Sequence, residues 1–215
     1  MKLYSYWRSS ASWRVRIALA WKGIPYEYRS VNLVRDGGEQ YGAIYVAEVN
    51  PLSQVPVLEL DGEGPPRRIA QSLAIIEYLE ERFPEPALLP TEPWLRARAR
   101  QLAEITNAGI QPFQNTPTLS HVRDVMRGDL KAWLRHFLDR GLRALERTAR
   151  ETAGTFLVGG SPTVADVCLV PQLYSARRFD VPLDPFPTLL RVESACNALP
   201  PFASAHPDRQ PDAPK

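Results

Sequence analysis

The N-terminal part of the chain alternates between short apolar runs and amphipathic segments. Short apolar runs bounded by turn residues predict strands, and apolar residues recurring every three or four positions predict helices. The predicted strands cover residues 2–6, 26–33, 56–60 and 67–70, and the predicted helices cover 12–22 and 72–83. Asp61-Gly62 is a hairpin signal between the last two strands. This order of elements predicts an α/β domain with a thioredoxin-like sheet.

A proline-rich segment follows this domain. Residues 84–93 hold four prolines in ten positions. Such a run continues neither a helix nor a sheet, and it behaves as a semi-rigid linker. We therefore expect a first domain at 1–83, a linker at 84–93 and a second domain at 94–215.

The second domain is predicted to be all helical. Apolar residues recur at helical spacing in 94–107 and in 122–152, where Gly128 and Gly141 are candidate breaks. The polar tail from His206 has too few apolar residues to fold alone, so it is either disordered or laid along the surface. The predicted fold class is an α/β thioredoxin-like N-terminal domain plus an all-α C-terminal domain.

Asp166 is a candidate catalytic carboxylate in the second domain. It follows Thr163 by three positions, which is the spacing of a helix capping box. In that motif each of the two side chains accepts a hydrogen bond from the other residue's backbone N–H. A capping box explains both residues, so we interpret Asp166 as structural.

The composition narrows the function classes. The 215 residues are 44% hydrophobic and 23% charged, which is ordinary for a soluble globular protein. A net charge of +2 gives no electrostatic basis for binding nucleic acid or an anionic membrane. We therefore expect small-molecule partners or a second copy of the chain. The sequence shows no signal-peptide pattern and no apolar run long enough to span a bilayer, which favours the cytoplasm.

The two cysteines also favour the cytoplasm. Cys168 and Cys196 are the only cysteines, and they belong to no CxxC motif or cysteine–histidine cluster. We expect both to be buried thiols in a reducing compartment, and we expect no metal site.

Three serines stand where the first helix begins, directly after the first strand. Ser9, Ser10 and Ser12 lie in the run Arg-Ser-Ser-Ala-Ser-Trp-Arg-Val-Arg-Ile-Ala-Leu, residues 8–19. A helix N-terminus offers unpaired backbone N–H groups and partial positive charge, so it can hold an anion or a thiolate. The simpler interpretation is that one serine is only the N-cap.

The run at 8–19 resembles the Ser-Ser-Cys-x-Trp-Arg-Val-Arg-Ile-Ala signature of the zeta class of cytosolic glutathione transferases. Further similarity is carried by Asn50-Pro51, Gln54-Val55-Pro56, Gln71-Ser72-Leu73-Ala74, Gly109-Ile110-Gln111-Pro112, Leu169-Val170-Pro171-Gln172 and His206-Pro207 with Pro211-Asp212. The resemblance covers nearly the whole chain. It departs at Ala11, where the family pattern has cysteine, so any role of that thiol does not carry over.

The resemblance implies that glutathione is the cofactor and that the first helix start holds its sulfur. Ser9 is implied to donate a hydrogen bond to the glutathione thiolate, with Ser10 as a second donor or cap. The implied glutathione contacts are Gln40, Val55, Pro56, Gln71, Ser72, Gln111 and Asn115, with Val55-Pro56 in a cis-proline loop. Arg8 and Arg178 are implied to bind substrate carboxylates; Arg177 is the alternative to Arg178 in a neighbouring register.

The activity implied by the resemblance is glutathione-dependent cis–trans isomerisation of maleylacetoacetate in phenylalanine and tyrosine catabolism. A thiolate can add reversibly to a conjugated double bond and so allow rotation. The alternatives are maleylpyruvate isomerisation, and conjugation or dehalogenation of small α-halo acids. A non-enzymatic binding protein on the same fold is disfavoured because Ser9 is retained. Members of the family are typically homodimers, so we expect a homodimer here.

Overall fold

The computed structural model describes residues 1–214 and divides into two compact units. Met1–Ala87 and the segment from Pro200 onward form unit 1, and Leu88–Leu199 form unit 2. The change of unit after Ala87 falls inside the expected linker at 84–93. The tail differs from expectation, because the chain from Pro200 packs with the first unit although we expected it in a second domain at 94–215.

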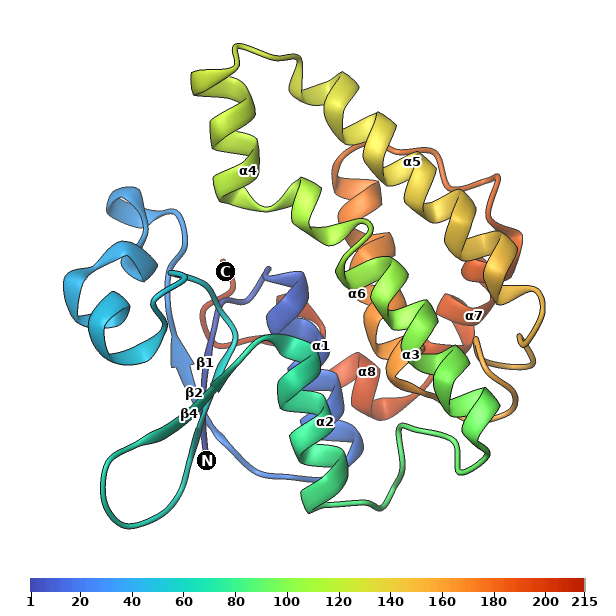
Figure 1. Ribbon diagram of the computed structural model, residues 1–215, viewed down its shortest axis with the longest axis horizontal. Helices are drawn as coiled ribbons and strands as arrows, with labels where there is room; N and C mark the ends of the chain where they lie inside the picture. The colour runs from blue at the N-terminus through green and yellow to red at the C-terminus, as the bar shows by residue number, and fades with distance from the viewer. Residues whose placement is uncertain (215) are drawn as a thin grey trace. The chain divides into compact units, whose positions relative to one another are not determined.

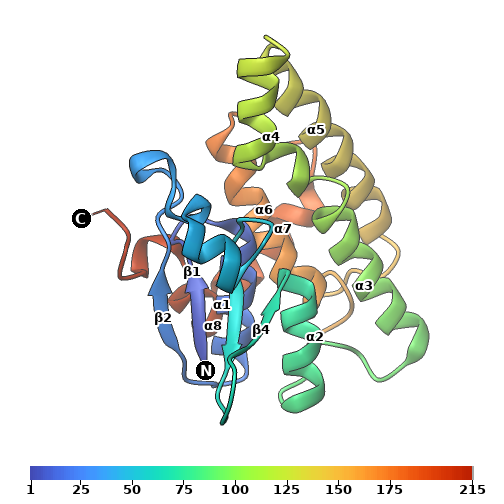
Figure 2. The same ribbon diagram turned by 60° about the vertical axis from the view of Figure 1, so that its left-hand side comes forward.

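Unit 1 contains a four-stranded mixed sheet (Figures 1 and 2). The strands are β1 (Lys2–Ser5), β2 (Glu27–Ser30), β3 (Val57–Leu60) and β4 (Arg67–Ala70), in the order β2-β1-β3-β4. β1 and β2 are parallel, whereas the β1–β3 and β3–β4 pairs are antiparallel. The parallel pair is connected through helix α1 (Ser10–Trp21), and the β3–β4 pair is the predicted hairpin. The thioredoxin-like arrangement predicted from the pattern is confirmed.

The second predicted strand is shorter than expected. β2 ends at Ser30 rather than at residue 33. The Asn32 side chain explains this, because its Oδ1 accepts hydrogen bonds from the backbone N–H groups of Val34 and Arg35. An asparagine that bonds its own following backbone makes a turn and competes with the strand ladder. The chain then forms the short helical turns Arg35–Gly37, Glu39–Tyr41 and Tyr45–Val49.

Helix α2 (Ser72–Arg82) packs on α1 and on strands β3 and β4, and α8 (Pro200–Ser204) packs on α1. In Figure 1, α1 and α2 lie on one side of the strands, and the pale-blue segment of residues 35–49 lies on the other. Leu3, Ile17 and Leu79 are fully buried in the core of this unit. Removing such side chains from water is the main stabilising term for a unit of this size. A rigid α1 fixes the serines at its start.

Unit 2 is helical, as the periodicity predicted. Its helices are α3 (Pro93–Asn107), α4 (Thr116–Ser120), α5 (Leu130–Ala149), α6 (Val164–Arg178) and α7 (Pro187–Asn197). α3 packs on α5 and α6, and α6 packs on α7. Asp129 caps the start of α5, so the chain is interrupted at Gly128 as the sequence suggested. At Gly141 the helix continues without a break.

The capping box at the start of α6 is present. Thr163 is the N-cap, and its side chain accepts from the backbone of the first turn while the Asp166 side chain accepts from the Thr163 N–H at 2.8 Å. Asp166 also accepts from Leu157 N at 2.8 Å and is fully buried. The structural interpretation of Asp166 is therefore confirmed, and its carboxylate also ties the preceding loop to the helix.

Two further expectations concern the thiols and membrane insertion. Cys168 and Cys196 are free and buried, as expected, and burial raises the pKa of the Cys196 thiol. Within residues 1–214, no helix has both the length and the apolar content needed to cross a bilayer.

Candidate functional site

Ser9 lies directly before α1 as its N-cap. Its Oγ accepts a hydrogen bond from Ser12 N at 3.2 Å, and its backbone carbonyl accepts from Trp13 N at 2.9 Å. A hydroxyl that accepts through a lone pair keeps its own O–H as a donor. The two interpretations of Ser9 are therefore compatible: the oxygen caps the helix while the proton remains available to an anion at the helix end.

The first turn of α1 continues this donor set. Ser10 and Ala11 are half-buried, and backbone N–H groups in a first helical turn have no partner in a preceding turn. Ser12 is fully buried, and its Oγ has no hydrogen-bond partner among the described residues. Ser12 therefore belongs to the helix interior, whereas Ser9 and Ser10 line the half-buried helix end.

Arg8 lies immediately before the Ser9 cap. Its guanidinium carbon lies 5.3 Å from the centre of the Trp7 ring, in a cation–π arrangement. The side chain is half-buried. Arg8 thus brings a positive charge into the same loop as the Ser9 hydroxyl.

A second helix N-terminus in unit 1 carries Gln71 and Ser72. Gln71 is the N-cap of α2, with a positive φ of 72°. Ser72 is the first residue of the helix and is only 4% exposed. Its hydroxyl oxygen accepts from Arg14 Nη1 at 3.2 Å. Since the oxygen accepts from a cation, the hydroxyl proton is again available to an anion.

Arg14 is a residue that the sequence reasoning did not single out. It lies in α1 and is fully buried, yet its guanidinium reaches the start of α2. A charged group is almost never fully buried unless it is paired or hydrogen-bonded. The sequence did contain a signal for a buried, hydrogen-bonded arginine. The Trp-Arg-Val-Arg run places Arg14 and Arg16 among the apolar residues of the first helix.

Val55 and Pro56 immediately precede β3, and the peptide bond between them is cis, as the resemblance implied. Both residues are buried. The loop before them is held by Tyr45 and Asn50, whose side chains both donate to the Gln54 carbonyl, at 2.8 and 2.9 Å. Val55 packs in one apolar cluster with Tyr6, Val31 and Tyr45. Tyr6 belongs to the loop before Ser9, so this cluster joins the two loops.

Gln40 lies in the irregular segment after β2 and is 3% exposed. Its Nε2 donates to the Leu33 carbonyl at 3.4 Å, and its Oε1 has no hydrogen-bond partner among the described residues. A Cβ on Gly38 would lie 2.4 Å from the Gln40 amide, so the glycine provides the space that this side chain occupies. A buried amide oxygen without a partner is a costly feature that a bound donor would relieve.

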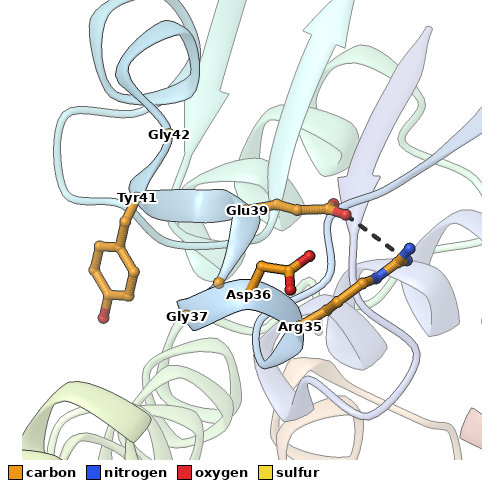
Figure 3. Close-up of a pocket in the computed structure, with 7 residues that line it drawn as sticks. Arg35, Asp36, Gly37, Glu39, Tyr41 and Gly42 are labelled. Atoms are coloured by element: carbon orange, nitrogen blue, oxygen red, sulfur yellow. Dashed lines mark ion pairs between the residues drawn. The ribbon is translucent and has the colours of Figure 1, made fainter.

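A shallow pocket lies beside Gln40. It is lined by Arg35, Asp36, Gly37, Gly38, Glu39, Tyr41 and Gly42. Figure 3 shows the Arg35 guanidinium extending toward the Glu39 carboxylate, 3.8 Å away, while the Tyr41 ring points away from both. This pair is well exposed to solvent, so it contributes little to stability.

The remaining candidate residues belong to unit 2. Gln111 opens a short helical turn, Gln111–Gln114, and its side chain donates to Asn115 Oδ1. Asn115 directly precedes α4. The structure therefore brings these two predicted residues together within unit 2.

Arg178 is the last residue of α6 and is exposed, with its guanidinium carbon 4.3 Å from the centre of the Phe179 ring. Its neighbour Arg177 makes two hydrogen bonds to the Glu193 carboxylate. The pairing with Glu193 holds the Arg177 pKa above its usual value. Arg177 thus has a structural role between α6 and α7, and Arg178 remains the candidate for substrate.

Comparisons of the sequence and of the structure with known proteins match the same family. Family models described as "Glutathione S-transferase, N-terminal domain" and "Glutathione S-transferase, C-terminal domain" match residues 3–87 and 133–201. Maleylacetoacetate isomerase of Rattus norvegicus is 47% identical over 99% of this chain and 94% of its own length. Maleylacetoacetate isomerase of Pseudomonas aeruginosa is 46% identical over 100% of this chain and 99% of its own.

Solved structures give the same result. A crystal structure of maleylacetoacetate isomerase from Anaeromyxobacter dehalogenans with glutathione bound in its active site matches with a TM-score of 0.91 and 56% identity, covering 99% of this chain and 97% of that one. A maleylpyruvate isomerase described as a bacterial zeta-class glutathione transferase matches with a TM-score of 0.92 and 41% identity, covering 100% of both chains.

Proposed function

The chain belongs to the maleylacetoacetate isomerase branch of the glutathione S-transferase family, and from that premise we propose that it catalyses the glutathione-dependent cis–trans isomerisation of maleylacetoacetate to fumarylacetoacetate. Rotation about a carbon–carbon double bond requires that the π bond be removed temporarily. Glutathione, when bound, supplies the thiolate that adds to the conjugated bond and later leaves. The protein's task is to hold that sulfur in its anionic form beside the substrate.

The donor set of unit 1 fits glutathione, whose carboxylates are anionic and whose sulfur must be held as a thiolate. Two helix starts each combine backbone N–H groups with a hydroxyl whose oxygen already accepts a hydrogen bond, Ser9 from Ser12 N and Ser72 from Arg14. Helix N-termini favour anions through their dipoles and their unpaired N–H groups. The unpaired Gln40 oxygen adds an acceptor for an N–H donor. The set therefore offers donors for two anionic groups and one complementary acceptor.

In this proposal Ser9 donates its O–H to the glutathione sulfur, with Ser10 as the second donor at the helix end. A donor to the charged form of a thiol lowers the thiol pKa and raises the thiolate fraction at neutral pH. The observation that carries the proposal is the Ser9 hydroxyl, because its oxygen caps α1 while its proton is left to donate.

The other residues of unit 1 are proposed to bind the tripeptide. Gln71 and Ser72 hold the γ-glutamyl carboxylate at the start of α2. Val55 pairs with the cysteinyl backbone, with Pro56 fixing the loop, and Gln40 accepts from glutathione. We propose in turn that Gln111 and Asn115 of unit 2 contribute further polar contacts, so that unit 1 is mainly the glutathione unit and unit 2 the substrate unit.

Arg8 and Arg178 are proposed to bind the substrate carboxylates and to offset the negative charge that develops on the substrate oxygens. Arginine is suited to this task because its planar guanidinium donates two parallel hydrogen bonds to a carboxylate. Fixed positive charge that meets developing negative charge is among the largest contributions to catalysis.

The test mixes purified protein with maleylacetoacetate and follows the loss of the cis isomer by absorbance, with and without catalytic amounts of glutathione. We expect turnover only with glutathione, and glutathione should be recovered unchanged. Absence of glutathione-dependent turnover with every cis-enedione acid tried would remove the isomerase proposal.

Maleylpyruvate is the second candidate substrate, because a maleylpyruvate isomerase is 41% identical over the full length. The same assay with maleylpyruvate decides between them. A larger kcat/KM for maleylacetoacetate supports the first assignment, and a larger value for maleylpyruvate supports the second.

We further propose that the enzyme is a homodimer in the cytoplasm, acting in phenylalanine and tyrosine catabolism. Support for association comes from large apolar side chains that unit 1 leaves exposed, including Ile44 at 73% and Leu52 at 63%. Sedimentation of the purified protein at several concentrations tests the assembly, since a monomer at all of them would contradict it.

A further inference from the structure

The C-terminal tail folds back onto unit 1. After α8 the chain makes one short turn, Pro207–Arg209, and then runs in non-helical form to Pro214. Figure 2 shows this segment, in red, beside β2. Of the two alternatives left open by the sequence, a disordered tail and a tail laid on the surface, the structure has the second.

Asp212 is the residue that fastens the tail. Its carboxylate accepts three hydrogen bonds, from Trp7 N at 3.1 Å, from the Tyr28 hydroxyl at 2.7 Å and from the Ser30 hydroxyl at 3.1 Å. Tyr28 and Ser30 lie on the edge strand β2, whereas Trp7 lies in the loop that leads to α1. One carboxylate therefore joins the tail, the sheet edge and that loop.

Arg16, in the buried part of α1, donates hydrogen bonds to the same loop before Ser9. It is 1% exposed, and its guanidinium donates to the Trp7 carbonyl at 2.9 Å and to the Tyr6 carbonyl at 3.3 Å. It also donates to the Ala205 carbonyl at 3.3 Å, in the segment where the tail begins. Burial lowers the Arg16 pKa to about 10, and the nearby Asp212 charge acts in the opposite direction. Arg16 therefore remains a cation at neutral pH.

The two charged side chains thus hold both peptide groups of Trp7. Asp212 accepts from its N–H, and Arg16 donates to its carbonyl. Hydrogen bonds to ionised groups are stronger than neutral ones and more strongly oriented. The held segment leads directly to the site, because Ser9 N donates to the Tyr6 carbonyl at 3.0 Å and Arg8 lies between Trp7 and Ser9.

We propose that Asp212 and Arg16 are positioning residues for the reaction: together they clamp the Trp7 segment and so fix the Ser9 hydroxyl and the Arg8 guanidinium. This inference rests on the proposed function of Ser9. Misplacement of a catalytic group by about 1 Å can lower a rate by about a hundredfold. The tail is accordingly part of the support of the active site.

The test compares four proteins: wild type, Asp212→Ala, Asp212→Asn and the control Ser30→Ala. Asp212→Ala removes all three hydrogen bonds. Asp212→Asn keeps the side-chain shape and one carbonyl oxygen but loses the charge. Ser30→Ala also removes a hydrogen bond to Asp212 but leaves the Trp7 bond in place. Three quantities are measured: amide hydrogen exchange at Trp7, the split between kcat and KM for glutathione, and the pH dependence of ionisation of the bound glutathione thiol.

For Asp212→Ala we expect amide exchange at Trp7 to be about tenfold faster and kcat about tenfold lower, with a raised pKa of the bound thiol. Asp212→Asn should be intermediate in all three, and Ser30→Ala should match wild type. Should Asp212→Ala fail to fold, Asp212→Asn is compared with Ser30→Ala in the same three measurements. The inference then requires that Asp212→Asn be impaired in all three and that Ser30→Ala not be.

Unchanged Trp7 exchange, or faster exchange with unchanged kcat and thiol pKa, would overturn the inference. A loss of activity that followed only the fraction of unfolded protein would do the same, because a purely structural role predicts it. Failure of the proposed function is distinguishable, since it shows as a wild type without glutathione-dependent turnover before any variant is compared.

Discussion

The Arg14 guanidinium donates a hydrogen bond to the Ser72 hydroxyl, across 3.2 Å from the interior of α1 to the first residue of α2. Both side chains are buried. A cation held beneath a helix N-terminus adds to the positive end of the helix dipole. In the proposed enzyme this arrangement strengthens the site for the glutathione carboxylate without exposing another arginine to solvent.

Replacing Arg14 by methionine should therefore weaken glutathione binding more than the chemical step. We expect KM for glutathione to rise about tenfold, which corresponds to about 1.4 kcal/mol and lies within the range for losing support to a charged group. Steady-state kinetics at varied glutathione give KM and kcat separately.

A double-mutant cycle with Ser72→Ala supplies the control for Arg14. Because the two side chains act through one hydrogen bond, the double variant should be less impaired than the sum of the singles. Additive effects on KM would show that Arg14 does not act through Ser72, and thermal unfolding of each variant separates binding effects from loss of fold.

Ser9→Ala should act on kcat rather than on binding. The hydroxyl is proposed to stabilise the thiolate, so its removal should raise the pKa of the bound thiol and lower kcat by at least a hundredfold, roughly the loss seen when one donor to a reacting anion is removed. The substitution also removes an N-cap and should cost about 1 kcal/mol of stability.

Two matched variants separate these effects at Ser9. Ser9→Thr keeps both the cap and a hydroxyl and should retain activity. Ser9→Asp keeps the cap, but its negative charge opposes the thiolate, so it should be stable and inactive. If Ser9→Ala changed KM for glutathione as much as Ser72→Ala does, the assigned division of roles would be wrong.

Whether a feature of the fold or of the site could be predicted from the sequence depends on how far apart in the chain the interacting residues lie. The sheet, the two helices of unit 1 and the capping box at Thr163 and Asp166 were predictable, because periodicity and capping act within a few residues. The Trp7–Asp212 hydrogen bond spans 205 positions and the Arg14–Ser72 bond spans 58. No periodic pattern encodes such pairs, so the positioning of the site by Arg14, Arg16 and the tail emerged only from the fold.

Gly141 shows that the role of a residue within a helix can also depend on a contact that the local sequence does not reveal. The sequence offered it as a candidate break, but α5 passes through it because the glycine makes room for a neighbour. A Cβ at this position would lie 2.3 Å from Ile110 Cγ1, and Ile110 is fully buried. In sequence, a glycine that ends a helix and a glycine that admits a side chain look alike.

Gly141→Ala should destabilise unit 2 despite the better helix propensity of alanine. Propensity favours the change by about 1 kcal/mol, but overpacking a closed core typically costs about 1–3 kcal/mol. We expect a net loss of up to about 2 kcal/mol, measured by urea unfolding. The double variant Gly141→Ala with Ile110→Val should recover part of this loss, and a Gly141→Ala protein more stable than wild type would contradict the packing argument.

Asp166 should give the stability of the protein a recognisable pH dependence. Burial raises the pKa of its carboxyl from 3.8 to about 6, although hydrogen bonds from Leu157 and Thr163 act in the opposite direction. The folded protein therefore binds this proton more tightly than the unfolded chain does. The contribution of the carboxyl to the free energy of unfolding is fully present below about pH 4, decreases between pH 4 and 6, and is constant above that. The difference corresponds to roughly 3 kcal/mol.

Asp166→Asn isolates this effect because asparagine does not titrate. The variant should be less stable than wild type, since its amide N–H₂ group faces backbone donors that the carboxylate accepts. The stability advantage of wild type over the variant should shrink by roughly 3 kcal/mol between pH 4 and pH 7. Urea unfolding at each pH measures the difference, and the carboxyl ¹³C shift of Asp166 reports its midpoint directly. An advantage that grew with pH, together with a midpoint below 4, would mean that the hydrogen bonds from Leu157 and Thr163 outweigh burial and that Asp166 is ionised wherever the protein is folded.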